Sequence, residues 1–534
     1  MLAAMISIFR HLHRERLLVY CLLLIVHVAL TLTFLADRSP GTDAASTGFP
    51  IDDAWIHLVY GRAVAQTGLP YYNDGALEAG FTSPLWMVFL ALAELARSVF
   101  SLPVVISVKF LGALLAWISS LAVYELCRKL SCSFLIALCA GALAAANPVS
   151  VFAQVSGMEV ALTGALLTLT ALTFALERWR SCAVLLGLSL LSRPESVLVL
   201  ILLVVVYWLS SHQTEMRLRL RTSMTLVLPA IIAAVMWICY CLAVTGHPLP
   251  NTFYAKYSNA DALNGFANII GEIVLGLPAM FVGFGIVLFL VGAVTMIYRA
   301  TKSSLVVLLI PWVFLAGIAV TRQMPPGCGV YFYWLRYAIP ALPFLFVPMA
   351  IGASVIADPK SCFASISIRP GMVKVFRVVA VLLLLACFGG YPSQMAYRKS
   401  QFAWNCQNIN EVQVEIGKWV KRNVPRDFSI LSFDAGAIRY WGEHKTIDFF
   451  GLNNHPLLFD QKLMHNINTQ PDSLADYMRS VRATHFVVFP ELRRSLVNSP
   501  SFQRLFSQVA EFSSPNYTVA TPLQRQMVIC GLNR

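Results

Sequence analysis

Two adjacent carboxylates, Asp52 and Asp53, follow the first hydrophobic segment of the chain. A carboxylate can take the proton of an acceptor hydroxyl, which is a poor nucleophile while neutral, and a neighbouring carboxylate can orient that base or hold a divalent cation. Ionised groups beside the hydrocarbon of a membrane are costly and usually belong to a working site. One aspartate could instead cap a helix beginning at Ala54, but capping needs a single carboxylate. We therefore predict that the pair carries the chemistry of the protein.

Four further charged residues stand at turns between hydrophobic segments. Glu78 lies in the same loop as the aspartates, Glu159 opens a long hydrophobic segment, and Arg193 and Glu195 flank Pro194. A guanidinium suits a lipid phosphate because it donates paired hydrogen bonds, although Arg193 could also pair with Glu195 as mere structure. Glu78 could equally be an ordinary exposed loop residue. We count all four as candidate binding residues.

A further polar stretch contains an imidazole, an amide and an ammonium group. These belong to His247, Asn251 and Lys256, and Arg336 follows the aromatic run at 331–334. Together they could hold a phosphate head group beside a surface that stacks on a sugar. The alternatives are an ordinary loop histidine, a lysine that snorkels to the interface and an aromatic belt at the membrane surface.

The elements that must position these residues are predicted to be membrane spans. The 534-residue chain is 57% hydrophobic and only 13% charged, and it repeatedly runs for long stretches without a charge. A hydrocarbon core of about 30 Å needs about 20 apolar residues per helix, so we predict a polytopic α-helical membrane protein with about eleven spans and interfacial helices. The run from Leu17 to Leu35 is long and lacks a cleavage pattern, so we expect a retained first helix. The spans are expected at 17–36, 104–126, 133–147, 150–176, 182–192, 195–210, 223–245, 268–297, 305–321, 335–356 and 375–391.

Basic residues orient these spans. The net charge of +13 falls mainly in short loops, which fits the positive-inside rule better than binding to nucleic acid. The N-terminal cluster at 10–16 places that end in the cytoplasm. Segment 84–100 is apolar enough to span, but counting it would place Arg128 and Lys129 outside, so we expect it to lie in the interface or to re-enter. The loop at 37–83, the polar turns and everything after Gly390 then face the outer side.

The break at 192–195 is a candidate cavity wall, because broken helices are tolerated only where the freed backbone faces protein or a wet cavity. No zinc spacing and no phosphate-binding loop occurs, so ATP-driven transport lacks its usual motor in this chain. No metal ligands are assigned. We expect either no tightly bound metal or a weakly held divalent cation.

After Tyr391 the composition becomes that of a soluble domain. We therefore divide the chain into a membrane catalytic domain at 1–391 and a small extracytoplasmic α/β domain at 392–534, with strands alternating with helices. The expected elements are helices at 408–422 and 473–481 and strands at 429–433, 446–450 and 485–489. Cys406 and Cys530 bracket this domain, and a disulfide between them is one of two outcomes that spacing leaves open.

Five blocks of sequence resemble GT-C fold glycosyltransferases that use polyprenyl-phosphate sugars. They are the loop from Phe49 to Trp86 and then SGMEVAL, LSRPESVL, HPLPNTFYAK and DAGAIRYWGEHKTIDFFGLNN, in this order up to Asn454. The branch that they resemble contains the mycobacterial terminal arabinofuranosyltransferases and related bacterial enzymes. The resemblance implies a multi-pass protein of the bacterial inner membrane, with catalysis on the outer face and inverting transfer from a lipid-phosphate donor.

The resemblance also suggests residue roles. Asp52 and Asp53 match the catalytic acidic pair of the family, with Asp52 as the preferred base. Ala79 departs from the usual EGYT pattern, which weakens the case for Glu78. The other motif positions that match are Glu159, Arg193, Glu195, Asn251 and Lys256. Asp434 and Asp448 belong to the last block, where they could serve an acceptor or simply cap turns.

We therefore expect an enzyme that moves a sugar, with arabinofuranosyl as the first choice, to a glycan, lipid or protein acceptor. The same fold with a hexose or aminopentose donor is the first alternative. A lipid or sugar transporter is the second, because broken helices and polar residues at membrane depth also occur there. A transporter predicts internal repeats and polar residues near the midplane, whereas this sequence shows no obvious repeat and gathers its polar blocks on one face.

Overall fold

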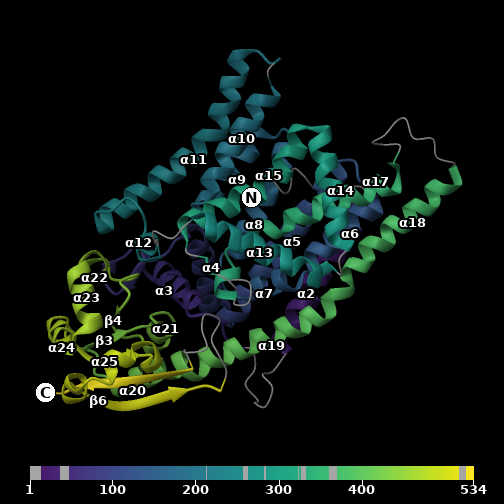
Figure 1. The fold of residues 1–534 in the computed structure, drawn as a ribbon. Helices are drawn as coiled ribbons and strands as arrows, with labels where there is room; N and C mark the ends of the chain where they lie inside the picture. The colour runs from purple at the N-terminus through teal and green to yellow at the C-terminus, as the bar shows by residue number, and fades with distance from the viewer. Residues whose placement is uncertain are drawn as a thin grey trace.

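The computed structural model describes residues 14–36, 47–211, 213–256, 262–281, 284–322, 324–325, 332–359, 370–515 and 525–533. The basic residues at 10–13, residues 37–46 of the first loop, Tyr331, Lys360 and Arg369 lie outside the described residues. The chain forms a helical body that narrows toward a smaller domain containing the C-terminus (Figure 1).

The helical body holds most of the described helices and one short hairpin. Its helices are α2 (Arg14–Ala36), α3 (Asp52–Thr67), α4 (Pro84–Phe100), α5 (Val104–Lys129), α6 (Phe134–Ala146), α7 (Pro148–Gln154), α8 (Val160–Ala175), α9 (Trp179–Ser192), α10 (Ser196–Ser210), α11 (Met216–Thr245), α12 (Asn251–Lys256), α13 (Ala262–Phe281), α14 (Phe284–Arg299), α15 (Lys302–Thr321), α16 (Phe332–Leu335), η1 (Ile339–Leu345), α17 (Phe346–Ala357) and α18 (Pro370–Ala386). The hairpin pairs β1 (Tyr71–Asn73) with β2 (Ala76–Leu77).

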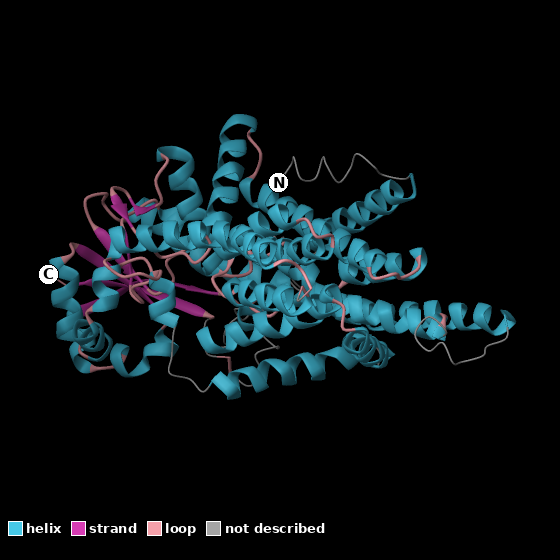
Figure 2. Ribbon diagram, turned by 90° about the horizontal axis from the view of Figure 1, so that it is seen from above, coloured by secondary structure: helices cyan, strands magenta, loops and turns pink. Residues whose placement is uncertain are grey.

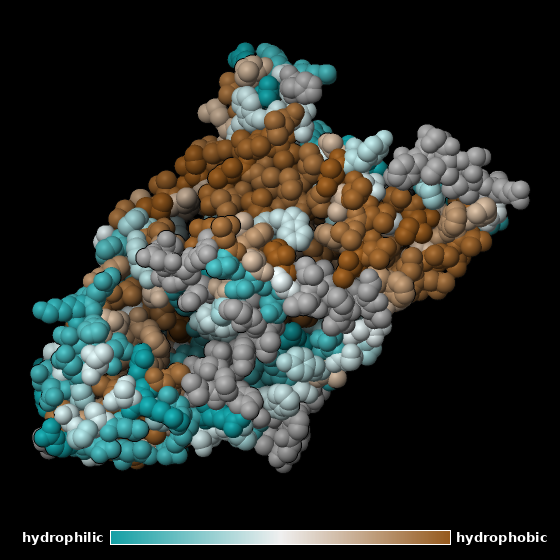
Figure 3. All heavy atoms as spheres, viewed as in Figure 1, coloured by the Kyte–Doolittle hydropathy of each residue, from teal (hydrophilic) through white to brown (hydrophobic). Residues whose placement is uncertain are grey.

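Six helices among the described residues are long and apolar enough to cross a membrane, and the bent pair α6 and α7 makes a seventh candidate. Four shorter apolar helices, α8, α9, α10 and α14, add to these. A band of hydrophobic side chains covers the surface over the helical body, whereas the smaller domain is mainly hydrophilic (Figure 3). The exposed apolar side chains of α11, such as Met224 at 71% and Met236 at 66%, belong to this band and suit contact with lipid.

The single span predicted at 150–176 is wrong. The segment is divided between α7 and α8, and these helices are separated by a turn in which Gly157 has a φ of 81°. Glycine adopts this left-handed conformation without the steric cost of a side chain. The ring of Phe49 packs against Gly157 so closely that any side chain there would collide with it. The turn therefore ends α7 and brings Glu159 to the start of α8.

Helices pack closely where small residues face each other. Gly292 of α14 and Gly352 of α17 lie at one crossing, and a Cβ atom on either glycine would collide with the backbone of the other helix. Small residues at crossings allow such close approach, which favours association through packing inside lipid. The expected break at 192–195 is present, since α9 ends at Ser192 and α10 begins at Ser196.

Helix α4 has one apolar face directed outward. Ser83 caps its N-terminus by accepting a hydrogen bond from Trp86 N at 3.3 Å, and Pro84 occupies the first turn. Trp86 is buried, whereas Leu92 and Val99 are 56% and 68% exposed. Among the described residues, α4 is not one of the helices that are long and apolar enough to cross a membrane. Its interfacial or re-entrant placement stays a prediction.

One long helical run joins the helical body to the C-terminal domain (Figure 1). It consists of α18, η3 (Cys387–Gly390), α19 (Tyr391–Ile409), the π-helical turn η4 (Asn410–Val414) and α20 (Glu415–Asn423). The domain division predicted at 391/392 falls inside this run and stays a prediction.

The C-terminal domain is built on a five-stranded mixed sheet with the order β4-β3-β5-β7-β6 (Figure 2). Strand β3 pairs in parallel with β4 and β5, whereas β7 pairs antiparallel with β5 and β6. The predicted strands agree with β3, β4 and β5, but β6 and β7 were not predicted. The elements are β3 (Ser429–Ser432), α21 (Ala437–Gly442), β4 (Thr446–Asp448), α22 (His455–Phe459), α23 (Gln461–Thr469), α24 (Pro471–Ser480), β5 (Ala483–Val488), η5 (Pro490–Arg493), α25 (Arg494–Val497), α26 (Pro500–Leu505), β6 (Phe506–Ser513) and β7 (Gln526–Leu532).

A disulfide between Cys406 and Cys530 is not formed. Both cysteines are free and buried. Cys406 lies on α19, with its thiol 3.5 Å from the carbonyl oxygen of Gly48. Cys530 lies on β7 opposite Phe486 and Gln508. The two thiols are therefore packed in different places, and sequence position could not reveal this.

Candidate active site

Asp52 joins the helical body to the C-terminal domain. Its two carboxylate oxygens accept hydrogen bonds from the backbone N–H groups of Gly436 and Ala437, both at 2.7 Å. These groups stand at the start of α21, and a Cβ atom at Gly436 would collide with Asp52. The predicted alternative that an aspartate caps its own helix is wrong. α3 begins at Asp52 itself, and its N-cap residue is Ile51, which makes no side-chain capping bond.

Asp53 binds two cations instead. Its Oδ2 atom accepts a hydrogen bond from Arg336 at 2.6 Å and another from Lys256 at 3.1 Å. Lys256 ends α12 and Arg336 follows α16, so three separate segments meet here. Burial raises the pKa of Asp53, but the charges of Lys256 and Arg336 outweigh it and hold that pKa well below its ordinary value.

Asp53 lies in the wall of a small cavity that we call the cationic pocket. Its charged lining contains four cations but only two carboxylates. The lining side chains that bear on its chemistry are Asp53, His57, Glu159, Arg193, Thr252, Lys256, Arg322, Arg336 and Tyr337. Although burial raises the pKa of Tyr337, the surrounding cations, Arg336 first among them, lower it to about 7. A phenol that ionises so readily reports a strongly positive potential.

Several donors of the cationic pocket have no hydrogen-bond partner among the described residues. They are Nε and Nη1 of Arg336, Nε of Arg193, Nε of Arg322 and Oγ1 of Thr252, all buried. A buried donor without a partner costs about 1–3 kcal/mol, and buried polar groups in native proteins are nearly always satisfied. The donors and the positive potential together suit an anion with several acceptor oxygens. A phosphate has this chemistry.

A buried ion pair forms the wall of the cationic pocket behind Asp53. Arg193 and Glu159 are 2.5 Å apart, and Glu159 is also 3.8 Å from His57 Nε2. His57 follows Asp53 by four residues on α3, so both side chains share one helical face. Arg193 also lies 4.7 Å from the ring centroid of Tyr337.

A second cavity of about 270 Å³ adjoins the cationic pocket, and we call it the acidic cavity. It shares Asp53, Ile56, Lys256 and Leu452 with the cationic pocket. Its lining combines carboxylates with aromatic rings, a combination that suits a sugar because carboxylates accept hydrogen bonds from hydroxyls and rings cover apolar faces. The carboxylates are Asp52, Asp53, Asp434 and Asp448, and the rings are those of Tyr333, Trp334, Phe433 and Phe450.

Three carboxyl groups of the acidic cavity, all except Asp53, hold their protons more strongly than usual. Burial raises the pKa of Asp52 to about 6, although the N–H groups of Ala437 and Gly436 oppose the shift. Burial also raises the pKa of Asp448 to about 7. The pKa of Asp434 is raised as well, by burial and then by the charge of Asp52. Values near neutrality suit a group that must exchange a proton during turnover.

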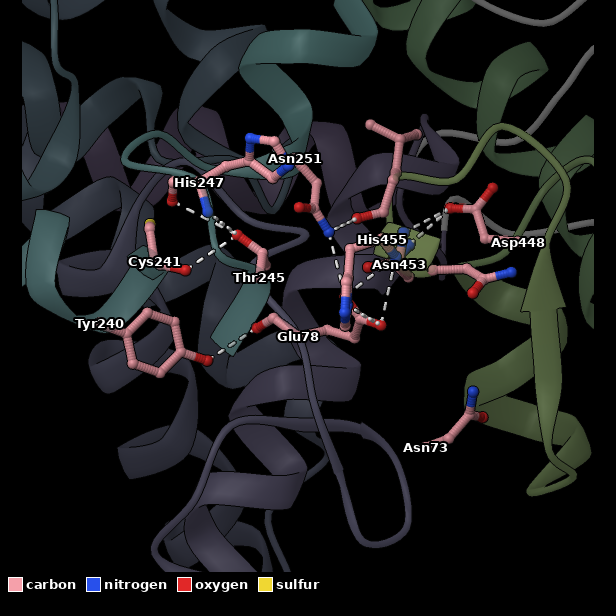
Figure 4. Close-up of polar contacts among 12 residues, drawn as sticks. Asn73, Glu78, Tyr240, Cys241, Thr245, His247, Asn251, Asp448, Asn453 and His455 are labelled. Carbon is pink, nitrogen blue, oxygen red and sulfur yellow. Dashed lines mark hydrogen bonds and ion pairs between the residues drawn. The ribbon is translucent and has the colours of Figure 1, made fainter. Parts of the chain in front are cut away.

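Glu78 belongs to a separate hydrogen-bonded cluster that connects the loop before α4 to the C-terminal domain (Figure 4). Asn251 Nδ2 donates to Glu78 at 3.1 Å and to the carbonyl of Leu452 at 3.0 Å. His455 Nδ1 lies 3.1 Å from the same carboxylate. Burial raises the pKa of Glu78, opposed by His455. Neither Glu78 nor Asn251 lines the cationic pocket or the acidic cavity.

Two other predicted residues lie away from both cavities. The ring of His247 stacks on Phe459 with centroids 3.6 Å apart, which attaches the loop before α12 to α22. Glu195 accepts a hydrogen bond from Thr321 at 3.1 Å and packs against α15. Of the ten predicted site residues, the structure brings six to the cavities, namely Asp52, Asp53, Glu159, Arg193, Lys256 and Arg336.

The sequence prediction omitted several residues of the cavities. His57 had a usable signal, because it repeats the spacing of one helical turn after Asp53. Arg322 precedes the aromatic run at 331–334, as Arg336 follows it, whereas Tyr337, Phe433 and Phe450 carried no signal in the sequence. No group of three or more His, Cys, Asp or Glu residues that could hold a metal occurs in the described part of the chain. The expectation of no tightly bound metal, or of a weakly held divalent cation, stays a prediction.

Comparison with solved structures shows which fold this is. ArnT from Cupriavidus metallidurans in the apo state matches with a TM-score of 0.59 at 13% identity, over 96% of this chain and 97% of ArnT. The same protein bound to undecaprenyl phosphate matches with a TM-score of 0.56 at 13% identity and the same coverage. The arabinofuranosyltransferase AftD from Mycobacteria matches with a TM-score of 0.53 at 17% identity, over 96% of this chain and 41% of AftD.

The chain therefore has an ArnT-like fold, and the predicted fold class is confirmed. In sequence, a family described as "Domain of unknown function (DUF8728)" matches residues 407–528, which include strands β3 to β6 and the start of β7. No curated protein matches the sequence.

Proposed function

We propose that this protein is an inverting membrane glycosyltransferase that moves a sugar from a polyprenyl-phosphate donor to a hydroxyl acceptor. One observation carries the proposal. A cationic pocket with unpartnered buried donors shares Asp53 and Lys256 with a cavity lined by carboxylates and aromatic rings. The cationic pocket suits a phosphate and the acidic cavity suits a sugar. The bond from the sugar to the phosphate would therefore lie beside the residues that the two cavities share.

The likeness to ArnT supports the class of donor. ArnT has been solved with undecaprenyl phosphate bound, and it shares this fold over nearly the whole of both chains. We propose that the phosphate of the donor binds Lys256 and Arg336 in the cationic pocket, with Arg322 and Arg193 nearby. Guanidinium groups bind phosphate oxygens in pairs, which fixes the orientation of the phosphate as well as its charge.

In the proposed reaction Asp52 is the general base. Its carboxylate takes the proton of the acceptor hydroxyl, the hydroxyl oxygen forms a bond to the anomeric carbon, and the bond from that carbon to the phosphate oxygen breaks. The electron pair stays on the departing polyprenyl phosphate, whose added negative charge Lys256 and Arg336 stabilise. Attack opposite the leaving phosphate inverts the anomeric centre. Groups aimed at charge that develops in the transition state are a large source of catalysis.

The two aspartates differ in fitness for the role of base. Lys256 and Arg336 hold the pKa of Asp53 low, which makes it a weak proton acceptor. Asp52 has a pKa of about 6 and is fixed by two backbone N–H groups beside the acidic cavity. We therefore assign Asp53 to orienting the two cations.

We place the enzyme in a bacterial inner membrane, with the cavities and the C-terminal domain on the outer face and a glycan, lipid or protein as acceptor.

The test is a donor panel. Purified full-length protein in lipid nanodiscs is incubated with synthetic polyprenyl-phosphate arabinofuranose, hexoses and an aminopentose, and the release of polyprenyl phosphate is followed. We expect one class of donor to be consumed, with arabinofuranose as the first choice. The proposal would be overturned if the protein binds undecaprenyl phosphate but consumes no donor faster than the Asp52→Asn variant does.

A further inference from the structure

A third and larger cavity, of about 1280 Å³, lies on the other side of α3, and we call it the basic groove. Asp53 and His57 face the cationic pocket, whereas Trp55 and Arg62 line the basic groove. At 100° per residue these pairs occupy opposite faces of the helix. The basic groove is therefore separate from the proposed catalytic site.

One wall of the basic groove is charged, with an excess of cations. The cations are Arg62, Arg97, Lys418, Lys421, Arg426 and Arg439, and the carboxylates are Asp74, Glu415 and Glu443. Lys418 and Lys421 lie on α20, and their side chains are 46% and 45% exposed. Each is paired with a glutamate, at 2.7 Å and 2.8 Å, but exposed pairs of this kind are weak and exchange partners easily.

Another part of the lining, which we call the apolar wall, lies at the ends of two spans. Leu35 comes from the end of α2, and 104–106 form the start of α5. Both helices are long and apolar enough to cross a membrane. The last residues of α4, Val99 and Phe100, are 68% and 70% exposed just before α5 in the chain. The lining of the basic groove therefore combines cations with apolar residues at the ends of helices that could cross a membrane.

Aromatic residues also line the basic groove. Trp441 is 37% exposed, and the ammonium group of Lys418 lies 5.8 Å from its ring centroid. Tyr440 is buried, with the guanidinium of Arg62 over its ring at 3.3 Å. Amphipathic rings of this kind favour the level of lipid head groups.

We propose that the basic groove binds the head group of an anionic membrane lipid and so docks α20 of the C-terminal domain on the membrane surface. The excess of cations selects a negative head group, and the apolar wall at the span ends accommodates the start of its acyl chains. A soluble anion would make no use of that wall. The proposal does not depend on which sugar the protein transfers, or on whether it transfers one.

The experiment compares two phospholipids on full-length protein released from nanodiscs. Native mass spectrometry counts the molecules of dioleoylphosphatidylglycerol or dioleoylphosphatidylcholine that remain bound. The test variant is K418E/K421E, and the matched control is R479E/R504E, which reverses two exposed charges of the same domain outside the basic groove. We expect the test variant to lose at least about tenfold in phosphatidylglycerol affinity while the control stays within twofold of wild type.

Two results would overturn the proposal. One is equal retention of phosphatidylglycerol by K418E/K421E and by the control. The other is displacement of the lipid by glycerol phosphate alone at the same concentration, which would assign the basic groove to soluble anions. An unchanged thermal unfolding midpoint of K418E/K421E verifies that the variant is folded. If the midpoint falls, K418Q/K421Q replaces it, with an expected loss of about threefold against the same control.

Discussion

The cationic pocket and the acidic cavity touch each other but have opposite chemistry. The cationic pocket has four cations against two carboxylates, whereas the acidic cavity has four carboxylates and Lys256 as its one cation among the lining residues. Asp53 and Lys256 belong to both. A reaction that separates a phosphate from a sugar needs this division, because negative charge grows on the phosphate while a proton leaves the attacking hydroxyl.

The two cavities also come from different parts of the chain. The cations and Glu159 lie on the helical body, whereas Asp434 follows β3 and Asp448 ends β4 in the C-terminal domain. The carboxyl ends of neighbouring parallel strands lie at one edge of a sheet, which is where ligands usually bind in α/β domains. The C-terminal domain thus completes the acidic cavity, and Asp52 holds it there through α21.

The largest effect is expected from Asp52→Asn. Loss of a general base lowers kcat by about 10²–10⁴-fold, and transfer from the preferred donor measures it. Undecaprenyl phosphate should still bind, because the cationic pocket is intact. Asp74→Asn, which changes an exposed aspartate paired with Arg439, should keep full activity. Full activity of Asp52→Asn would move the role of base to another carboxylate of the acidic cavity.

A smaller effect, on phosphate binding in the cationic pocket, is expected from Arg336→Gln. The loss of charged hydrogen bonds to the phosphate should weaken the binding of undecaprenyl phosphate by about 10–100-fold, as measured by fluorescence competition in nanodiscs. Arg219→Gln is the matched control, because Arg219 stacks on Trp208 at 4.3 Å and lies outside both cavities. Equal binding by the two variants would contradict the phosphate assignment.

The pH dependence of kcat should separate the two aspartates. The base must be ionised, and the raised pKa of Asp52 means that its carboxylate is lost below about pH 6 rather than below its ordinary value near 4. Activity should therefore be flat above pH 7 and fall by about tenfold per pH unit below 6. The low pKa of Asp53 predicts no loss in that window. A profile that stays flat down to pH 5 would exclude Asp52 as the base.

The smallest effect should come from Trp334→Ala in the acidic cavity. Removal of one stacking ring should raise KM for the sugar donor by about 2–10-fold, while the affinity for undecaprenyl phosphate without a sugar stays unchanged. Trp334→Phe keeps a ring and should recover most of the loss. An equal loss of affinity for both ligands would show that the two cavities are not separate subsites.

Much of the architecture could be predicted because it depends on local composition. Hydrophobic length determines the spans, and the break at 192–195 follows from a charged pair around Pro194. Strands β3, β4 and β5 were visible as short apolar runs, but β6 and β7 were not. Only Phe506 of β6 is buried and most of its other residues are exposed, so the strand depends on pairing with β7 rather than on its own hydrophobicity.

The sequence alone determined that acids and cations gather at the turns of a membrane protein, because charged residues in such a composition are costly and therefore informative. The tertiary structure decided how they divide. It directed Asp52 to α21 and Asp53 to Lys256 and Arg336, although the two are chain neighbours. Successive residues of a helix point about 100° apart, so their partners come from segments that are remote in sequence. Adjacency in the chain could therefore predict a site, but not the separate environment of each carboxylate.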